Sequence, residues 1–219
     1  MRCHATANIA AVLFLLTASP SMAATPLDDL IKPAPGNRAC FTRVYDAAHL
    51  RKNPRQKVTS ATVWLMYGMP NMPGAPLSGV DFGLALTRRD DPAPMFASGG
   101  CAWDAQANRD TSNRRMFTQH KGDAGVICTM LAQPDVFEVS SAEEGAPVLF
   151  DRGKDANTLM LYLTDGLSMV RRADRAKHLD IELGTADRVF QLHRTATKDC
   201  AAVENALTER EPAPSPARR

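Results

Sequence analysis

The chain of 219 residues carries 26 Lys and Arg against 24 Asp and Glu, a formal net charge of +2. This near-neutral balance excludes the strongly basic face of a typical nucleic-acid-binding protein. After the N-terminal segment, no apolar run approaches the ~20 residues that a membrane helix needs. We therefore expect the mature chain to be soluble and to form one domain.

Residues 1–23 have the three parts of a secretory signal peptide. Arg2 supplies the basic start, an apolar run extends from Ile9 to Leu16, and Ser21-Met22-Ala23 forms a small-residue cleavage site. The apolar run is too short to span a bilayer. The sequence thus predicts export, cleavage after Ala23 and a periplasmic or secreted mature protein.

The two ends of the mature chain are rich in proline. Residues 24–37 are expected to form an irregular lead-in, because they contain Pro26, Pro33, Pro35 and Gly36. Residues 201–219 are expected to form a short helix followed by a proline-rich mobile tail, with Asp199 as a candidate helix cap.

Between these ends, residues 38–200 follow the period of two that is typical of half-buried strands. The alternation is clearest at 80–86 and 179–183. Weaker strand patterns cover 40–45, 58–67, 126–131, 136–139, 148–150, 159–163 and 189–193. About nine strands separated by turn residues predict an all-β, mainly antiparallel fold, either a sandwich or a barrel, with one or two short helices.

Four cysteines remain once Cys3 is removed with the signal peptide: Cys40, Cys101, Cys128 and Cys200. An even number in an exported chain predicts two disulfides, for which four cysteines allow three connectivities. We favour Cys101 with Cys128, which are close in sequence, and Cys40 with Cys200, which would join the first strand to the last. A zinc site is disfavoured because the chain lacks CxxC-like pairs.

Two histidines have a carboxylate at a spacing that brings both residues to one face. His49 follows Asp46 by three on a predicted helical turn, and His178 precedes Asp180 by two on a predicted strand. Either pair could supply a base with an orienting carboxylate, as in a hydrolase, or half of a metal site. The simpler interpretation makes Asp46 a helix N-cap and Asp180 part of the polar face of its strand.

A small-residue turn is expected at Ser98-Gly99-Gly100-Cys101, where the cysteine could be taken for a nucleophile. A disulfide would remove that reactivity. The glycines then permit a bulge or a close approach of two backbones beside the bond.

The methionines of Met66-x-x-Met69-x-x-Met72 are spaced so that they could bind Cu(I), because thioethers are soft ligands that select this ion. The alternative is packing, with Met66 in a strand and the other two under a loop. Copper is the only cofactor that the sequence suggests.

The run from Cys40 to Leu50, with Pro54, Gln56, Val58 and Thr59, resembles the opening of an uncharacterised family of exported bacterial proteins. Ser98-Gly99-Gly100-Cys101-x-Trp103 and Asp187-Arg188-Val189-Phe190 share this resemblance. It implies export and a single domain but no activity.

The sequence contains no recognisable set of nucleophile, base and orienting group. We therefore expect a non-enzymatic module that binds a protein or small molecule in the cell envelope, with contacts on loops such as Asp104–Gly122 or Met69–Ser78. A Cu(I)-binding protein and a histidine-dependent hydrolase are the two alternatives.

Overall fold

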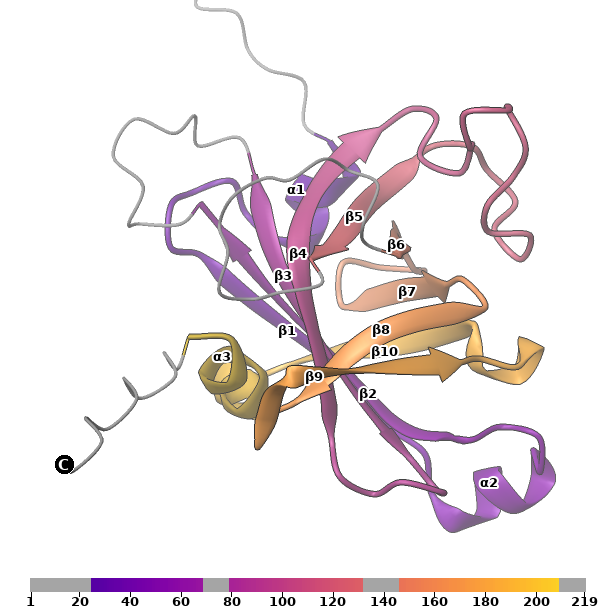
Figure 1. The fold of residues 1–219 in the computed structure, drawn as a ribbon. Helices are drawn as coiled ribbons and strands as arrows, with labels where there is room; N and C mark the ends of the chain where they lie inside the picture. Colours follow the sequence, from indigo (N-terminus) through magenta and orange to yellow (C-terminus); the bar gives the residue numbers. More distant parts are fainter. Residues whose placement is uncertain (1–24, 69–78, 132–145, 209–219) are drawn as a thin grey trace, which may run out of the picture.

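The computed structural model describes residues 25–68, 79–131 and 146–208 and shows an all-β protein (Figure 1). Its sheet has ten antiparallel strands. They are β1 (Arg38–Val44), β2 (Val58–Tyr67), β3 (Val80–Arg88), β4 (Met95–Asp104), β5 (Gly125–Leu131), β6 (Pro147–Arg152), β7 (Thr158–Leu163), β8 (Gly166–Arg171), β9 (Asp174–Glu182) and β10 (Val189–Thr195).

Eight of these strands close into a barrel. Their order is β3-β2-β1-β10-β7-β6-β5-β4, and β4 pairs again with β3. The predicted fold class is therefore confirmed, and of the two architectures left open by the sequence the barrel is the one observed.

The remaining two strands form a hairpin, β8–β9, that is joined to the barrel through β4. Strand β4 pairs with β5 from Ser98 onward, whereas its start pairs with β8 at Met95 and Phe96. The inner face of the hairpin adds Leu167 and Met169 to the main core. The hairpin thus extends the hydrophobic core beside the start of β4.

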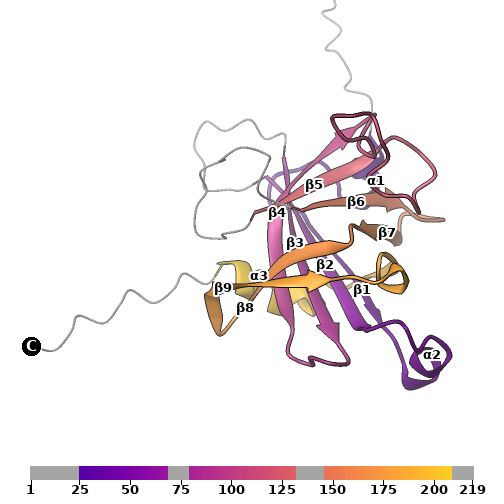
Figure 2. The same ribbon diagram turned by 45° about the vertical axis from the view of Figure 1, so that its right-hand side comes forward.

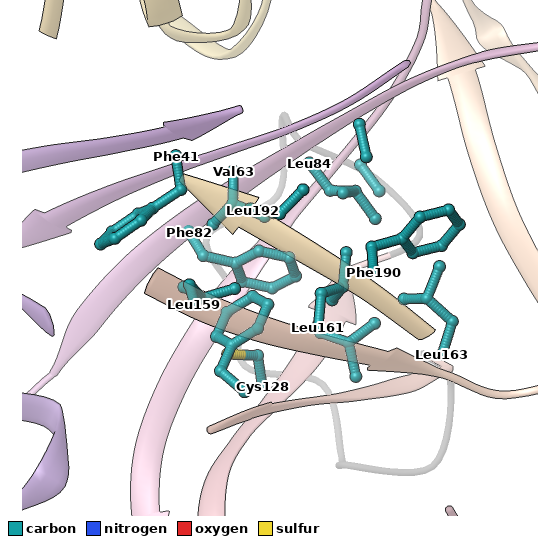
Figure 3. Close-up of a cluster of buried hydrophobic side chains, with 14 of the residues drawn as sticks. Phe41, Val63, Phe82, Leu84, Cys128, Leu159, Leu161, Leu163, Phe190 and Leu192 are labelled. Carbon is teal, nitrogen blue, oxygen red and sulfur yellow. The ribbon is translucent and has the colours of Figure 1, made fainter. Parts of the chain in front are cut away.

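Side chains fill the barrel interior, as Figure 3 shows. Phe41, Phe82, Phe150 and Phe190 are all buried, and the rings of Phe82 and Phe150 meet edge to face with centroids 5.7 Å apart. An eight-stranded barrel is just wide enough to be packed in this way. The period of two in the sequence arises from this interior, because alternate residues of each strand point into it.

The structure corrects the strand assignment at several places. The expected turn at Ser98–Cys101 lies inside β4, and β8 was not predicted. At Gly99 the two backbones approach so closely that a Cβ would lie 1.9 Å from the Thr129 carbonyl oxygen, which confirms the close approach expected of these glycines. The predicted strand 136–139 lies outside the described residues.

Within the described ranges, three short α-helices accompany the barrel. Helix α2 (Ala47–Lys52) is capped as predicted by Asp46, whose Oδ1 accepts a hydrogen bond from the His49 backbone N–H at 2.7 Å. The lead-in is not irregular throughout, because it contains α1 (Pro26–Leu30), which buries Leu27 and Leu30 in the main core. Proline at the first helical position favours this helix, an effect that the sequence argument overlooked.

Helix α3 (Ala201–Thr208) lies on the outer face of the barrel. It follows the 3₁₀ turn η2 (Thr197–Cys200), so Asp199 lies within that turn and is not the N-cap that the sequence suggested. A second 3₁₀ turn, η1 (Thr185–Asp187), links β9 to β10. Val203 of α3 packs with Trp64 of β2 and Phe96 of β4 in a separate hydrophobic cluster.

Both favoured disulfide pairings are present. Cys40–Cys200 ties β1 to the turn before α3, with Cα atoms 5.8 Å apart. Cys101–Cys128 joins directly paired residues of β4 and β5. Two disulfides indicate an oxidising, extracytoplasmic compartment. Within the described residues, no helix is long and apolar enough to cross a membrane.

Candidate functional site

The first predicted histidine pair is resolved in favour of helix capping. The Asp46 carboxylate accepts from the backbone of His49, and the ring of His49 instead meets Gln56, with Nε2 3.0 Å from Oε1. The Gln56 amide nitrogen donates to the Val58 carbonyl at 2.8 Å, so the amide oxygen faces the imidazole. In this arrangement His49 Nε2–H donates a hydrogen bond to Gln56 Oε1. The orienting partner of His49 is an amide, not the predicted carboxylate.

The second predicted pair, His178 and Asp180 of β9, lies close to Ser168 of the adjoining strand β8. In the β8–β9 hairpin, Ser168 lies directly opposite Asp180, and His178 Nδ1 is 3.5 Å from Ser168 Oγ. All three side chains share one face of the hairpin. The separation of serine and histidine is longer than the ~2.6 to 3.2 Å of an engaged nucleophile and base. Sequence reasoning missed Ser168 because only the hairpin register brings it to His178.

The methionine segment is only partly described. Met66 is 5% exposed and packs in the outer cluster with Val203 under α3, while Met69 and Met72 lie outside the described residues. Beside Met66 in register is Asp81 of β3, and burial raises the pKa of this carboxyl. In the described part of the chain, no group of three or more His, Cys, Asp or Glu residues is arranged to hold a metal ion.

The most extensively built polar feature is the segment between β4 and β5, residues 105–124, hereafter the β4–β5 loop. It folds back on itself around Asn108, whose side chain is completely buried. Asn108 Oδ1 accepts from the Phe117 backbone N–H at 2.7 Å. Its Nδ2 donates to the carbonyls of Phe117 at 3.2 Å, His120 at 3.4 Å and Gly122 at 3.0 Å. The Asn108 side chain thus holds the backbone of the loop in its folded conformation, and we call this its template role.

His120 anchors the loop to the barrel wall. Its ring is 4% exposed, with Nδ1 2.8 Å from the Gly122 carbonyl and Nε2 3.2 Å from Asp151 Oδ2 of β6. Its edge meets Tyr162 of β7 with centroids 4.9 Å apart. Burial, followed by the charge of Asp151, raises the pKa of Tyr162. The ring of His120 thus bridges a backbone carbonyl of the loop and a carboxylate of the barrel wall.

Apolar contacts complete this attachment. Phe117 and Ala107 of the loop pack on Leu149 of β6 in a cluster of their own on the outside of the barrel. Gly125, the first residue of β5, leaves room for Leu149, because a Cβ there would lie 2.6 Å from that side chain. The loop therefore has its own small core in addition to its polar template.

The outer surface of the loop is polar and held by ion pairs. Asp123 accepts from Arg109 at 3.1 Å and lies 3.4 Å from Arg115, and the hydrogen bond from Arg109 is the main cause of its lowered pKa. Arg114 reaches Asp110 at 3.0 Å, but its side chain remains 79% exposed. The loop offers a fixed set of charged groups to solvent.

The sequence pointed to this segment only by its length and polarity. Nothing in the run of polar residues identified Asn108 as the buried one, and no sequence pattern assigned a role to His120. The signal that could have helped is Phe117, a large apolar residue inside a polar segment, which indicates a local core.

Comparison of the chain with known protein families, with curated proteins and with solved structures finds no match.

Proposed function

We propose that the protein is a non-enzymatic binding module of the periplasm or extracellular space, exported by the signal peptide of residues 1–23, and that the β4–β5 loop is its binding surface. The observation that carries this proposal is the buried amide of Asn108, which bonds four backbone groups of one loop. A surface loop organised to this degree is pre-ordered for contact, and pre-ordering reduces the entropy lost on binding.

The packed barrel interior supports the same conclusion. Because hydrophobic side chains occupy the interior, the ligand contacts of this proposal lie on the outside of the barrel. The exposed groups of the loop include Thr111, Arg114 and Lys121, and Trp103, which is 36% exposed, precedes it on β4. Tryptophan and arginine are enriched among the residues that dominate protein interfaces. We therefore propose a protein partner in the cell envelope.

The test is site-specific crosslinking. A photoreactive residue at Arg114 should capture one defined envelope protein, whereas the same group at Lys198, an exposed site on η2, should not. Purified partner should then bind the Lys198→Glu control with unchanged affinity. It should bind Arg114→Glu at least ~10-fold more weakly, since like-charge contacts and lost pairs at interfaces cost more than about 1.4 kcal/mol. Equal capture from both positions, or equal affinity of both variants, would refute the proposal.

The Ser168, His178 and Asp180 set favours a second candidate function, hydrolysis with Ser168 as nucleophile. In that case a fluorophosphonate probe should label Ser168, and labelling should be lost in Ser168→Ala and His178→Ala but retained in an Asn157→Ala control. Absence of labelling in folded protein would exclude this candidate.

A further inference from the structure

Helix α2 is an unusual part of this fold because it buries none of its six residues. Polar anchors hold it at the barrel end. Asp46 caps its start, and Arg89 Nη2 at the end of β3 donates to the carbonyls of Leu50 at 3.2 Å and Asn53 at 3.4 Å. A helix that contributes nothing to the core, yet is fixed at both ends, is positioned for contact outside the molecule.

The sequence segment that contains α2 is rich in positive charge. Residues 43–57 contain five Lys or Arg and a single Asp, although the whole chain is almost neutral. Arg51, Lys52 and Arg55 are exposed, and no carboxylate in the described part of the chain pairs with them. On the β4–β5 loop, by contrast, Arg109 and Arg114 both have carboxylate partners. The α2 end therefore presents cations whose counter-charge is not supplied within the described residues.

The same end of the barrel exposes an apolar side chain. Val44, the last residue of β1, is 76% exposed, the highest exposure among the large hydrophobic residues of the described chain. Next to it, Tyr45 stacks on His49 of α2 with ring centroids 4.6 Å apart, and the Arg43 guanidinium lies 5.2 Å from the Tyr45 ring centroid. Arg43 Nη1 also lies 3.3 Å from His193 Nε2 of β10. These contacts hold the end of β1 against α2, at the end of the barrel where Val44 is exposed.

We propose that the α2 end, comprising Arg43, Val44, Arg51, Lys52 and Arg55, docks on an anionic lipid surface. The basic side chains would meet lipid phosphates, and Val44 would contact the boundary between headgroups and acyl chains. Basic residues combined with exposed apolar ones are the combination that interfacial binding requires. The β4–β5 loop and α2 lie at opposite ends of the barrel in both views (Figures 1 and 2). A molecule docked through α2 would thus project the loop away from the membrane.

The experiment is co-sedimentation of the exported protein with two kinds of vesicle, one of phosphatidylglycerol mixed with phosphatidylcholine and one of phosphatidylcholine alone. We expect binding to the anionic vesicles only, weakened by added salt. The triple variant Arg51→Gln, Lys52→Gln, Arg55→Gln should bind on the order of 100-fold more weakly. Each Lys or Arg near an anionic surface contributes about a fivefold factor in affinity, and three such factors multiply. Val44→Ser should weaken binding less and should leave the salt dependence unchanged.

The matched control removes three exposed cations outside both surfaces, Lys32→Gln, Lys154→Gln and Lys198→Gln, which changes the net charge equally. This control should bind vesicles like the parent protein. Equal loss in both triple variants would reduce the effect to net charge and overturn the proposal. Binding to soluble polyphosphate without vesicle binding would also overturn it, in favour of a soluble polyanion. Because this surface does not include the β4–β5 loop, protein-partner affinity reports separately on the proposed function.

Discussion

Replacing Asn108 by alanine is the sharpest test of how the β4–β5 loop is built. The substitution leaves the buried Phe117 N–H without its 2.7 Å acceptor and removes the donor shared by three carbonyls. A buried polar group left unpaired costs about 1 to 3 kcal/mol. We therefore expect a loss of about 2 to 4 kcal/mol if the loop stays closed. If the loop opens, water satisfies these groups, and the loss equals the smaller free energy of local opening.

Two measurements distinguish these outcomes. Thermal unfolding of Asn108→Ala should give a Tm lower by roughly 4 to 16 °C if the loop stays closed. Hydrogen exchange should show faster exchange of the Phe117 amide in either case. Asn157→Ala, a substitution of an exposed asparagine on the β6–β7 turn, should change unfolding by no more than ~0.5 kcal/mol. Unchanged exchange at Phe117 together with an unchanged Tm would refute the template role of Asn108.

Three further predictions concern the barrel. Gly99→Ala should lower the unfolding free energy by at least ~3 kcal/mol in chemical denaturation, because the added Cβ would meet the backbone of β5. Gly100→Ala should fold normally, since there is open space at that position. Similar stabilities of the two variants would contradict the close approach. Removing the Cys40–Cys200 disulfide, with a sequence separation of 160, should lower the unfolding free energy by about 2 to 5 kcal/mol, and an unchanged value would show that this bond is not structural. Burial raises the folded-state pKa of Asp81, so its charge destabilises the fold at neutral pH, and this cost is relieved as pH falls through that pKa. Asp81→Asn should accordingly raise the Tm at pH 7, and the gain should disappear in acid, below the ordinary carboxyl pKa; a gain that is independent of pH would rule out this origin.

The barrel wall was predictable where strands alternate. Segments such as 80–86 report burial directly, since one face of each strand meets the core. Strand β4 was missed at Ser98–Cys101 because Gly99 is selected by a neighbouring backbone, not by strand propensity. Closure of the barrel was equally out of reach, because it depends on β4 pairing with both β3 and β5.

The candidate site was less predictable for a related reason. The roles of its polar residues depend on contacts between separate elements, such as His120 with Asp151 or Ser168 with His178. Local patterns correctly identified a local interaction, the cap formed by Asp46 three residues before His49. A polar side chain in a loop gives no periodic signal that separates a buried template such as Asn108 from a solvated neighbour.

The position of the second disulfide explains how the loop and the α2 end can act independently. Cys101 and Cys128 are paired across β4 and β5, near the points at which the β4–β5 loop leaves the barrel, so the bond fixes the stem of the loop whether the loop is closed or open. Opening of the loop then remains local, because the strands that continue toward the other end keep their register. Helix α2 depends on a different set of anchors, Asp46 and Arg89, at that other end. Sites that share no partners and are separated by a packed core contribute additively to stability. A partner bound at the loop and a surface contacted by α2 can therefore be held at the same time by one rigid barrel.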